Sequence, residues 1–518
     1  MTAKLVTALA KRLDAAGDTE VLETHISWVI LAGPFAYKLK KPVDLGFADL
    51  TTLESRRRCC EEELRLGRRT APSLYLAVIP ITGTRLAPRI GGEGPPIEWA
   101  VRMRRFPQAA LLDRLAKWRA LDTGLVDSLA ETVAAFHAAI PKAPSASPFG
   151  TPEEIRAETE GNFTGIRDYA GAFVGRDRLG PLHAWVVREG ERLEVHFARR
   201  HAGGFVRECH GDLHLGNVAL IDGRPVPFDA IDFDERLRWI DVMSEVAFTA
   251  IDLEAHGLTR HAHRFVDAYL SITGDYDALA ALPYYRVYRA MVRAKVAAIR
   301  YAQCDEDVDA CAAAVMDLER HLALAEAATR PPGPALIAMH GLPGSGKTTF
   351  AQELLEALGA VRIRSDVERK RVHGLAADAR TGSAPGAGLY DREADERTQS
   401  RLLAAAREAL EGGGIAIVDS TGILRANRHA MRELARDLDV PFVLVGLAAP
   451  DDLLRERIAA RERAGKDASE AGIAVLERQM QRLEPLTADE LENAVIVESA
   501  RGKDAFAAAI ESIRPRIA

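Results

Sequence analysis

The chain has 518 residues, of which 47% are hydrophobic and 28% charged, and its formal net charge is -7. One hydrophobic core rarely serves a chain of this length, so we expect at least two domains. The negative net charge excludes a protein that binds nucleic acid through its overall charge, although a local basic groove is compatible with it. No apolar run is long enough to cross a bilayer and the N-terminus lacks the apolar core of a signal peptide, so we expect a cytoplasmic protein without a membrane partner.

The cysteines predict buried thiols. Cys59, Cys60, Cys209, Cys304 and Cys311 form no C-x-x-C pair and no matched Cys/His spacing. We therefore expect neither a zinc site nor a disulfide framework.

Residues 25–41 predict a β-hairpin that turns at Gly33-Pro34 and ends in lysines. The sequence F-A-Y-K at 35–38 has the form of the V-A-I-K strand of protein kinases, whose lysine contacts nucleotide phosphates and a helix glutamate. Lys38 is the candidate for this role and Lys40, on the same strand face, is the alternative. Solvated lysines on an edge strand would give the same pattern.

The next segment, 53–69, is rich in helix formers and charge. A kinase-like lobe needs one glutamate on such a helix to pair with the strand lysine. Glu63 is the candidate and Glu62 the alternative, while a solvated helix face is the competing interpretation.

Residues 74–81 and 97–103 predict two further strands, which complete a small β-rich lobe. We expect a hinge at 104–107 and the adenine ring against 101–103. Residues 111–199 are helical in pattern, and His137 within them predicts a packed or capping histidine without a chemical role.

The strongest signal in this half is C-H-G-D-L-H-L-G-N at 209–217, which follows the H-x-D-x-x-x-x-N pattern of a kinase catalytic loop. Phosphoryl transfer needs a carboxylate to orient and deprotonate the attacking hydroxyl, and metal ions to bridge the phosphates. Asp212 is the predicted catalytic carboxylate and Asn217 a predicted Mg²⁺ ligand. A strand predicted over 226–233 ends in Asp232-Phe233, and we place Asp232 at the D-F-G aspartate as the second metal ligand.

These motifs resemble the aminoglycoside phosphotransferase family, which shares its fold with protein kinases. The resemblance covers roughly residues 21–328 and rests on H-G-D-L-H-x-G-N, on I-D-F at 231–233 and on W-I-D-V at 239–242. It implies a bilobal α+β kinase-like fold that uses ATP and Mg²⁺, with Asp241 bracing the catalytic loop. Relatives phosphorylate antibiotics, choline, homoserine, sugars and proteins, so a small-molecule hydroxyl acceptor is implied. One departure is the turn at 32–34, which lacks a G-x-G-x-x-G phosphate cover.

A proline-rich linker at 329–334 precedes a second domain. This domain opens with an apolar strand, a turn that fits G-x-x-x-x-G-K-[ST], and a helical pattern, which is the context of a phosphate-binding loop. Small residues let backbone N–H groups turn inward around an anion at the positive end of a helix. Lys347 would neutralise the β/γ-phosphates and the Thr348 hydroxyl would hold Mg²⁺. The predicted nucleotide-binding residues are Gly341, Gly344, Ser345, Gly346, Lys347, Thr348 and Thr349.

Strands predicted over 335–340, 361–364, 415–419, 441–447 and 494–498 alternate with helices, which indicates a five-stranded parallel sheet. Ligands bind at the carboxyl ends of such strands, where two acids are found. Asp419 resembles a Walker B carboxylate that reaches Mg²⁺. Asp366 is a candidate base for the acceptor hydroxyl, with an N-cap for the following helix as the alternative.

A helix from 451 carries Arg455, Arg457, Arg461 and Arg463, and small P-loop kinases close an arginine-bearing lid over the transferring phosphoryl group. Arg461 and Arg463 are the lid candidates; a charged amphipathic helix is the alternative. The Ala- and Gly-rich segment 376–389 is expected to be a loop.

The half from 335 to 518 resembles the small P-loop kinases that include gluconate kinases, zeta toxins and the kinase domain of polynucleotide kinases. The R-S-D at 364–366 and the R-x-R-x-G-x-D-A-S-E-A pattern from Arg461 on support this resemblance. The whole arrangement resembles a bacterial family described as bifunctional aminoglycoside phosphotransferase/ATP-binding proteins. The predicted division is therefore 1–328, 329–334 and 335–518.

The leading hypothesis is an enzyme with two ATP- and Mg²⁺-dependent phosphotransferase modules acting on hydroxyl groups. Two alternatives stay open. The C-terminal module is a 5′-hydroxyl polynucleotide kinase with a nucleic acid partner, or one module binds nucleotide as a regulatory switch. Aminoglycoside resistance is not expected, because no acceptor site is recognisable.

Overall fold

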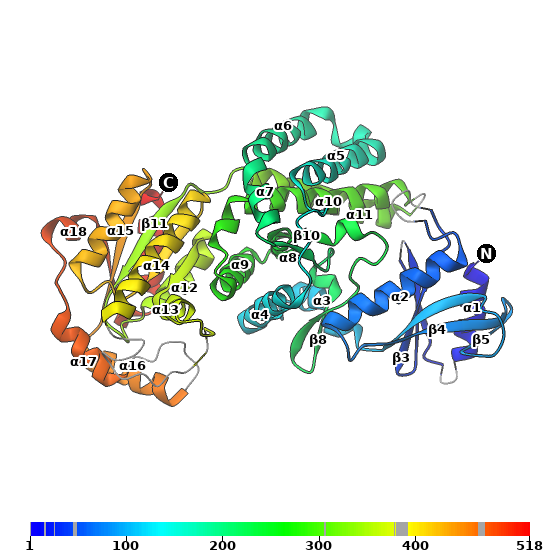
Figure 1. The fold of residues 1–518 in the computed structure, drawn as a ribbon, viewed down its shortest axis with the longest axis horizontal. Helices are drawn as coiled ribbons and strands as arrows, with labels where there is room; N and C mark the ends of the chain where they lie inside the picture. The colour runs from blue at the N-terminus through cyan, green and yellow to red at the C-terminus, as the bar shows by residue number, and fades with distance from the viewer. Residues whose placement is uncertain are drawn as a thin grey trace. The chain divides into compact units, whose positions relative to one another are not determined.

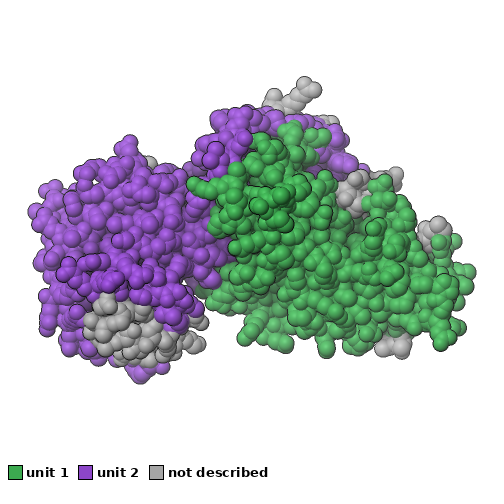
Figure 2. All heavy atoms as spheres, in the orientation of Figure 1, with its two compact units in different colours: residues 1–164, 197–256 green, residues 165–196, 257–518 purple. Residues whose placement is uncertain are grey.

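The computed structural model describes residues 2–14, 17–24, 26–44, 49–304, 307–377, 379, 392–464 and 472–517, except the side chains of residues 2, 172, 176, 177, 461, 462 and 464. The chain forms two compact units (Figure 2), one of residues 1–164 and 197–256 and one of residues 165–196 and 257–518. This division by packing does not follow the linker at 329–334, because helices that precede the linker pack in the second unit. The boundaries drawn from the sequence stay a prediction.

The first unit contains a six-stranded antiparallel sheet with the order β1-β2-β3-β6-β4-β5 (Figure 1). Its strands are β1 (Glu20–Glu23), β2 (Ser27–Ala32), β3 (Phe35–Lys40), β4 (Tyr75–Thr84), β5 (Ala87–Ile90) and β6 (Glu98–Arg104). The predicted hairpin and the two later strands are confirmed. The short outer strands β1 and β5 were not predicted, since four residues carry too little alternation to be recognised.

Helices cover both faces of this sheet. Ile30 and Leu39 pack with Leu9 of α1 (Thr2–Leu13) on one face. Leu31 and Ala36 pack with Cys60 of α2 (Leu53–Thr70) on the other. Because successive strand residues point to opposite faces, Lys38 and Lys40 of β3 share the face of Ala36 and point towards α2.

The segment after the sheet is mainly helical, as predicted, and contains short hairpins around the catalytic-loop motif. Its elements are η1 (Gln108–Ala110), α3 (Leu112–Lys117), α4 (Thr123–Ala139), α5 (Pro152–Val174), α6 (Arg176–Arg192), α7 (Glu194–Ala202), β7 (Val206–Glu208), η2 (Leu215–Asn217), β8 (Val218–Ile221), β9 (Arg224–Pro227), η3 (Glu235–Leu237), β10 (Trp239–Asp241) and α8 (Val242–Ala255). Strand β9 ends at Pro227, so the strand predicted to continue to Phe233 is too long. Helix α8 is buried at every residue from Val242 to Leu253 and forms the centre of this region.

The second unit contains the predicted five-stranded parallel sheet, in the order β12-β13-β11-β14-β15. Its strands are β11 (Ala335–His340), β12 (Val361–Arg364), β13 (Ile415–Asp419), β14 (Phe442–Ala448) and β15 (Ala494–Glu498). The connecting elements are α12 (Lys347–Leu358), α13 (Ser365–Val372), α14 (Arg392–Glu411), α15 (Arg425–Asp437), α16 (Asp451–Ala464), α17 (Ile473–Arg482), α18 (Ala488–Asn493), η6 (Ser499–Arg501), α19 (Lys503–Ile513) and η7 (Arg514–Arg516). Phe350 of α12 and Phe506 of α19 meet edge to face, 5.1 Å between ring centroids, in the core under one face of the sheet. The fold class predicted from the sequence is confirmed for both halves.

Four elements precede the linker: α9 (Thr259–Thr273), η4 (Tyr276–Ala280), α10 (Leu282–Ala302) and α11 (Val308–Ala328). Helix α9 packs against α12 and β12, and η4 packs against α14. Buried Asp267 of α9 accepts a hydrogen bond from the backbone N of Arg362 at the start of the sheet, N···Oδ1 2.6 Å. The kinase-like helices are thus part of the packing around the P-loop sheet.

Cys304 and Cys311 form a disulfide across the α10–α11 turn, which corrects the prediction that all five cysteines are free thiols. The turn between two antiparallel helices brings these residues together. Cys59, Cys60 and Cys209 are free and buried, as predicted. Within the described ranges, the helices are too short or too polar for any of them to span a membrane.

Candidate functional site

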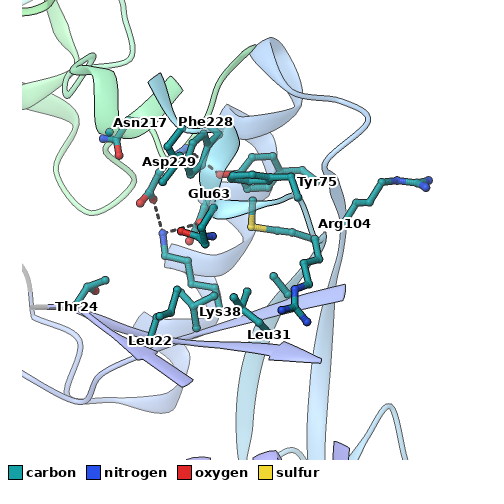
Figure 3. A pocket seen from close by; sticks show the side chains of 18 residues that line it. Leu22, Thr24, Leu31, Lys38, Glu63, Tyr75, Arg104, Asn217, Phe228 and Asp229 are labelled. Carbon is teal, nitrogen blue, oxygen red and sulfur yellow. Dashed lines mark hydrogen bonds and ion pairs between the residues drawn. The ribbon is translucent and has the colours of Figure 1, made fainter. Parts of the chain in front are cut away.

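The two strand lysines share one glutamate. Lys38 Nζ lies 2.8 Å from Oε1 of Glu63 and Lys40 Nζ lies 2.7 Å from Oε2. Glu62, the alternative, instead pairs with Arg65 and Arg238 at 2.6 and 2.7 Å. The predicted Lys38–Glu63 ion pair is therefore present (Figure 3), and Lys40 belongs to the same cluster.

This cluster is held in its charged form. Burial by itself raises the pKa of Glu63, but the charges of Lys38 and Lys40 outweigh it and bring the pKa to about 2. Burial lowers the pKa of Lys38, but Asp229 and Glu63 outweigh it and leave it above the ordinary value. Lys38 is therefore a permanent cation, as a group that neutralises phosphate must be.

The second acid that lines the cavity is Asp229, whereas Asp232 is the residue that the sequence predicts as a metal ligand. The Asp229 carboxylate contacts Lys38 Nζ, is 40% exposed and lines the same cavity as Asn217 (Figure 3). The Asp232 side chain is 3% exposed and contacts Lys40. The physical reason is the early end of β9, which puts the residue after Phe228 into the site and turns Asp232 inward.

Asp229 adopts a left-handed backbone with φ 64°. Such a conformation is strained for a residue other than glycine and persists only when its surroundings enforce it. Here the hydroxyl of buried Tyr75 accepts a hydrogen bond from the Asp229 backbone N, 3.0 Å. Tyr75 was not found from the sequence, where no motif marks it.

The predicted catalytic loop brings Asp212 and Asn217 together. Asn217 Nδ2 donates to the backbone O of Asp212 at 2.9 Å and to its Oδ2 at 3.1 Å. The Asp212 side chain is 36% exposed, so its carboxylate is accessible from solvent. Because the Asn217 amide nitrogen is used inside the loop, its Oδ1 is the atom available to a cation.

Three side chains of α8 form hydrogen bonds with the backbone of the catalytic loop. Their spacing in the sequence places them on one face of the helix. Glu245 accepts from the backbone N of Gly211 at 2.7 Å, Thr249 donates to the Leu213 carbonyl at 2.8 Å and Asp252 accepts from Leu215 N at 2.8 Å. His137 is buried and its Nε2 lies 2.9 Å from Glu245, which confirms it as a packed histidine.

Asp241, which the family resemblance implied as the brace of the loop, has another partner. It forms a buried pair with Arg200, Nε···Oδ2 2.6 Å, and caps α8 by accepting from Met243 N at 2.8 Å. Glu245, one turn further along α8, takes the bracing role. The sequence does not distinguish the two acids, because both lie at the start of one apolar helix.

A cavity of about 200 Å³ lies in front of these groups. Lys38, Glu63, Asn217 and Asp229 line its polar side, and its apolar wall includes Met103 and Phe228. Of the residues expected against adenine, Met103 lines the cavity, whereas Val101 is buried in the sheet core.

In the second unit the glycine-rich turn has the conformation that the motif requires. Gly341, Gly344 and Gly346 have φ of 145°, 81° and 90°. A Cβ on Gly341 would lie 2.7 Å from the Leu447 carbonyl, and one on Gly344 would lie 2.7 Å from the Leu454 carbonyl. Only glycine satisfies both the backbone angle and the space at these positions.

The polar side chains of this turn lie at its helix end. Lys347 is buried and its Nζ donates to the Leu342 carbonyl, 2.9 Å, so that it crosses the loop. Ser345 Oγ is buried without a hydrogen-bond partner among the described residues. Thr348 and Thr349, in the first turn of α12, are exposed.

The two acids predicted at the carboxyl ends of strands lie there. Asp419 is buried as the last residue of β13, beside Arg364 of β12 in the strand register. Asp366 is half-buried and is the second residue of α13, whose N-cap is Arg364, so the N-cap alternative is wrong.

Arg457, which the sequence did not single out, contacts the P-loop. Its Nη1 donates to the Gly344 carbonyl at 3.2 Å and to Ser499 Oγ at 2.9 Å. Arg463 is exposed and its Nε donates to the carbonyl of Ala459, 3.2 Å. The side chain of Arg461, residues 465–471 and most of the loop expected at 376–389 lie outside the described residues.

Comparisons with known proteins give matches to both halves. Residues 336–486 match the family model described as an AAA domain. Uncharacterized protein Rv2004c of Mycobacterium tuberculosis is 31% identical over 461 residues, which are 89% of this chain and 90% of that protein.

Among solved structures, the amicoumacin kinase hAmiN is 12% identical with a TM-score of 0.40, and the match covers 62% of this chain and 96% of that one. A gluconokinase from Sinorhizobium meliloti 1021 is 23% identical with a TM-score of 0.25, over 36% of this chain and 94% of that one. The chain belongs to the family that includes Rv2004c of M. tuberculosis, and its C-terminal P-loop half carries the match to an AAA domain.

Proposed function

We propose that this protein is an ATP- and Mg²⁺-dependent phosphotransferase with two sites, each of which transfers the γ-phosphate to a hydroxyl acceptor. The observation that carries the proposal is the meeting of Lys38, paired with Glu63, with Asp229 and Asn217 at one cavity. A fixed cation opposite oxygen ligands is the arrangement that phosphoryl transfer requires.

In the kinase-like half, Lys38 would contact the phosphates and the Asp212 carboxylate would accept the proton of the acceptor hydroxyl. Asn217 Oδ1 and the carboxylate of Asp229 are hard oxygen donors, which fit Mg²⁺. The bound ion would neutralise charge on the β- and γ-phosphates. Glu63 keeps Lys38 in place, and α8 keeps the loop that carries Asp212 rigid.

In the P-loop half, the backbone N–H groups of Gly344, Gly346 and Lys347 and the Lys347 ammonium group would hold the phosphates. Thr348 Oγ1 and the carboxylate of Asp419 would hold Mg²⁺, and Asp366 would take the acceptor proton. Arg457, bonded to the loop through Gly344, is a further cation for the transferring group.

The test is transfer of labelled γ-phosphate from ATP by wild type, Asp212→Asn and Lys347→Ala, with sugars, nucleosides, aminoglycosides and 5′-hydroxyl RNA as acceptors. Each variant is expected to lose a different product. Binding of ATP by wild type without transfer to any acceptor would contradict the proposal, and loss of the same product in both variants would contradict two independent sites.

A regulatory role for the P-loop half is a second candidate, favoured by one set of contacts. Asp267 of α9 bonds Arg362, and Arg362 Nη1 donates to the backbone O of Thr348 at 3.3 Å. This connects a kinase-like helix to the first turn of the phosphate-binding helix. If the half is a switch without turnover, Asp366→Ala will leave the activity of the protein intact.

A further inference from the structure

A cavity of about 880 Å³ in the P-loop half lies at the carboxyl ends of β12 and β13. Ser365 follows β12 and Ser420 follows β13, so both strands end at its wall. The other walls come from α14, the start of α15 and α17. In a parallel sheet this edge is where ligands bind.

The cavity adjoins the phosphate-binding loop. Gly341, the first residue of that loop, donates its N–H to the carbonyl of Thr421, 3.0 Å, and Thr421 lines the cavity. A Cβ on the next residue, Gly422, would lie 2.7 Å from the Met339 carbonyl of the neighbouring strand. The cavity wall and the phosphate loop are thus in direct contact.

The charges that line the cavity do not cancel. Its acids, Asp395 and Glu396, are already paired with Arg369 and Arg392 at 2.7 and 2.9 Å.

Two more lining arginines, Arg478 and Arg482, form no ion pair with any residue that the structure describes. They are four residues apart on α17 and therefore lie on one face of that helix. The cavity offers two guanidinium groups to an anion, and arginine binds carboxylate and phosphate through paired hydrogen bonds.

Two amide atoms at the cavity also lack partners. Gln399 Nε2 and Gln479 Oε1 are buried and make no hydrogen bond among the described residues, and both side chains line the cavity. A buried polar atom without a partner costs free energy, which a ligand that supplies the hydrogen bond recovers. One amide donor and one amide acceptor match hydroxyl groups, which both donate and accept.

None of the described side chains that line the cavity is aromatic. Sites for single-stranded nucleic acid stack bases on aromatic side chains. The cavity therefore favours a ligand without a nucleobase over the end of a nucleic acid strand.

We propose that this cavity binds the acceptor of the P-loop half, and that the acceptor is a non-aromatic polyhydroxy compound that carries a carboxylate or phosphate group. This inference rests on the phosphotransferase function proposed above. Arg478 and Arg482 bind the anionic group, and Gln399 and Gln479 bind hydroxyls.

A hydroxyl oxygen of the acceptor forms the new bond to the γ-phosphorus, and the bond from that phosphorus to the β–γ bridging oxygen breaks. ADP leaves with the bridging oxygen, and the hydroxyl proton passes to the carboxylate of Asp366. No oxidant or further reactant is needed.

The test uses the full chain with Asp212→Asn, so that only the P-loop half transfers phosphate. The acceptors are glucose, glucuronate and glucose 6-phosphate, which differ only at carbon 6, and a 5′-hydroxyl oligonucleotide. We expect glucuronate or glucose 6-phosphate to exceed glucose in kcat/KM by about 10-fold or more, and the difference between these two identifies the anionic group.

The added substitutions Arg478→Gln and Arg482→Gln are expected to lower kcat/KM for the charged acceptor by about 100-fold through KM, with the KM for ATP unchanged. Arg436→Gln, which changes an exposed arginine of α15 outside the cavity, is the matched control and is expected to have no effect. Equal use of glucose and the charged sugars, preference for the oligonucleotide, or no effect of the two cavity substitutions overturns the inference.

Binding measured by calorimetry separates this inference from the proposed function. Binding of a charged sugar that depends on Arg478 and Arg482, without phosphate transfer, supports the cavity and contradicts the kinase reaction. Lys347-dependent transfer to neutral glucose alone supports the reaction and overturns the cavity. Failure of both charged sugars to bind at millimolar concentration also overturns it.

Discussion

Lys40 Nζ lies 2.7 Å from Glu63 Oε2, and the two side chains are 0% and 1% exposed. The same lysine also contacts the buried carboxylate of Asp232. Burial lowers the pKa of Lys40, but Asp232 and Glu63 outweigh it and leave the pKa well above the ordinary value. One buried ammonium group therefore contacts two buried carboxylates at the kinase-like site.

Replacement of Lys40 by Met is expected to destabilise the protein strongly, because it leaves Glu63 and Asp232 with one fewer buried counter-charge. Breaking a buried pair costs about 3–5 kcal/mol. The measurement is urea unfolding followed by circular dichroism. Lys41→Met is the control: its partner Glu23 is 64% exposed, so a loss of at most about 1 kcal/mol is expected. Equal effects of the two substitutions would show that the buried cluster adds no stability.

Asp229 and Asp232 are expected to separate catalysis from stability. In the Lys347→Ala background, Asp229→Asn should lower kcat/KM of the kinase-like site by about 100-fold and raise the Mg²⁺ concentration it needs, since a metal ligand is lost. Asp232→Asn should lower kcat/KM by about 10-fold and should also lower the midpoint of urea unfolding, because Asp232 acts through Lys40. Titration of activity with Mg²⁺ checks both. A stronger Mg²⁺ dependence in Asp232→Asn than in Asp229→Asn would show that Asp232 is the metal ligand instead.

His210 is expected to make stability depend on pH. Its Nε2 donates to the Phe228 carbonyl at 2.8 Å and its Nδ1 accepts from Asp212 N at 3.3 Å, so the ring is neutral. Burial lowers the pKa of His210 below its ordinary value of 6.5. Below pH 6.5 the unfolded chain therefore takes up a proton that the folded chain does not, and the free energy of unfolding falls by up to about 1.4 kcal/mol per pH unit.

The measurement for His210 is urea unfolding between pH 7 and 5. His210→Gln keeps a donor for Phe228 but does not titrate, so its stability should fall less steeply with acid than that of wild type. Identical slopes in the two proteins would mean that His210 is charged in the folded state or exposed.

Gly341→Ala is expected to impair nucleotide binding at the P-loop. The left-handed φ costs about 1–3 kcal/mol for alanine, and the added Cβ would meet the Leu447 carbonyl and Ser345 Oγ at 2.7 and 2.9 Å. We expect a loss of ATP affinity of about 10-fold or more in a calorimetric titration. Gly333→Ala, in the linker, meets nothing within 4 Å and should bind ATP as wild type does. Unchanged affinity in Gly341→Ala would contradict the assigned loop geometry.

The parts of the fold and site that could be predicted are those whose geometry is local in the chain. The glycine spacing from Gly341 to Gly346 defines a turn by itself, and the H-x-D-x-x-x-x-N spacing brings Asp212 and Asn217 together within one loop. The hairpin at Phe35 and the five strands of the parallel sheet follow from the alternation and length of apolar runs.

The parts that could not be predicted depend on where an element ends or on contacts between distant segments. Two acids, Asp229 and Asp232, follow β9, and only the end of the strand at Pro227 decides which enters the site. Glu245 reaches the loop because α8 lies beneath it, and the Cys304–Cys311 bond depends on the turn between two helices. Arg457 was one of several arginines on α16, and its role depends on the rotation of that helix.

The bond from Asp267 to Arg362 crosses the proline-rich linker in sequence, since its donor lies after the linker and its acceptor before it. A fragment that begins at residue 335 would lose the carboxylate that satisfies the first edge of its sheet, together with the helix that covers it. The two halves of the chain are therefore not independent. A helix that precedes the linker covers the edge of the P-loop sheet, so the two halves could be separated in evolution only if that edge were rebuilt.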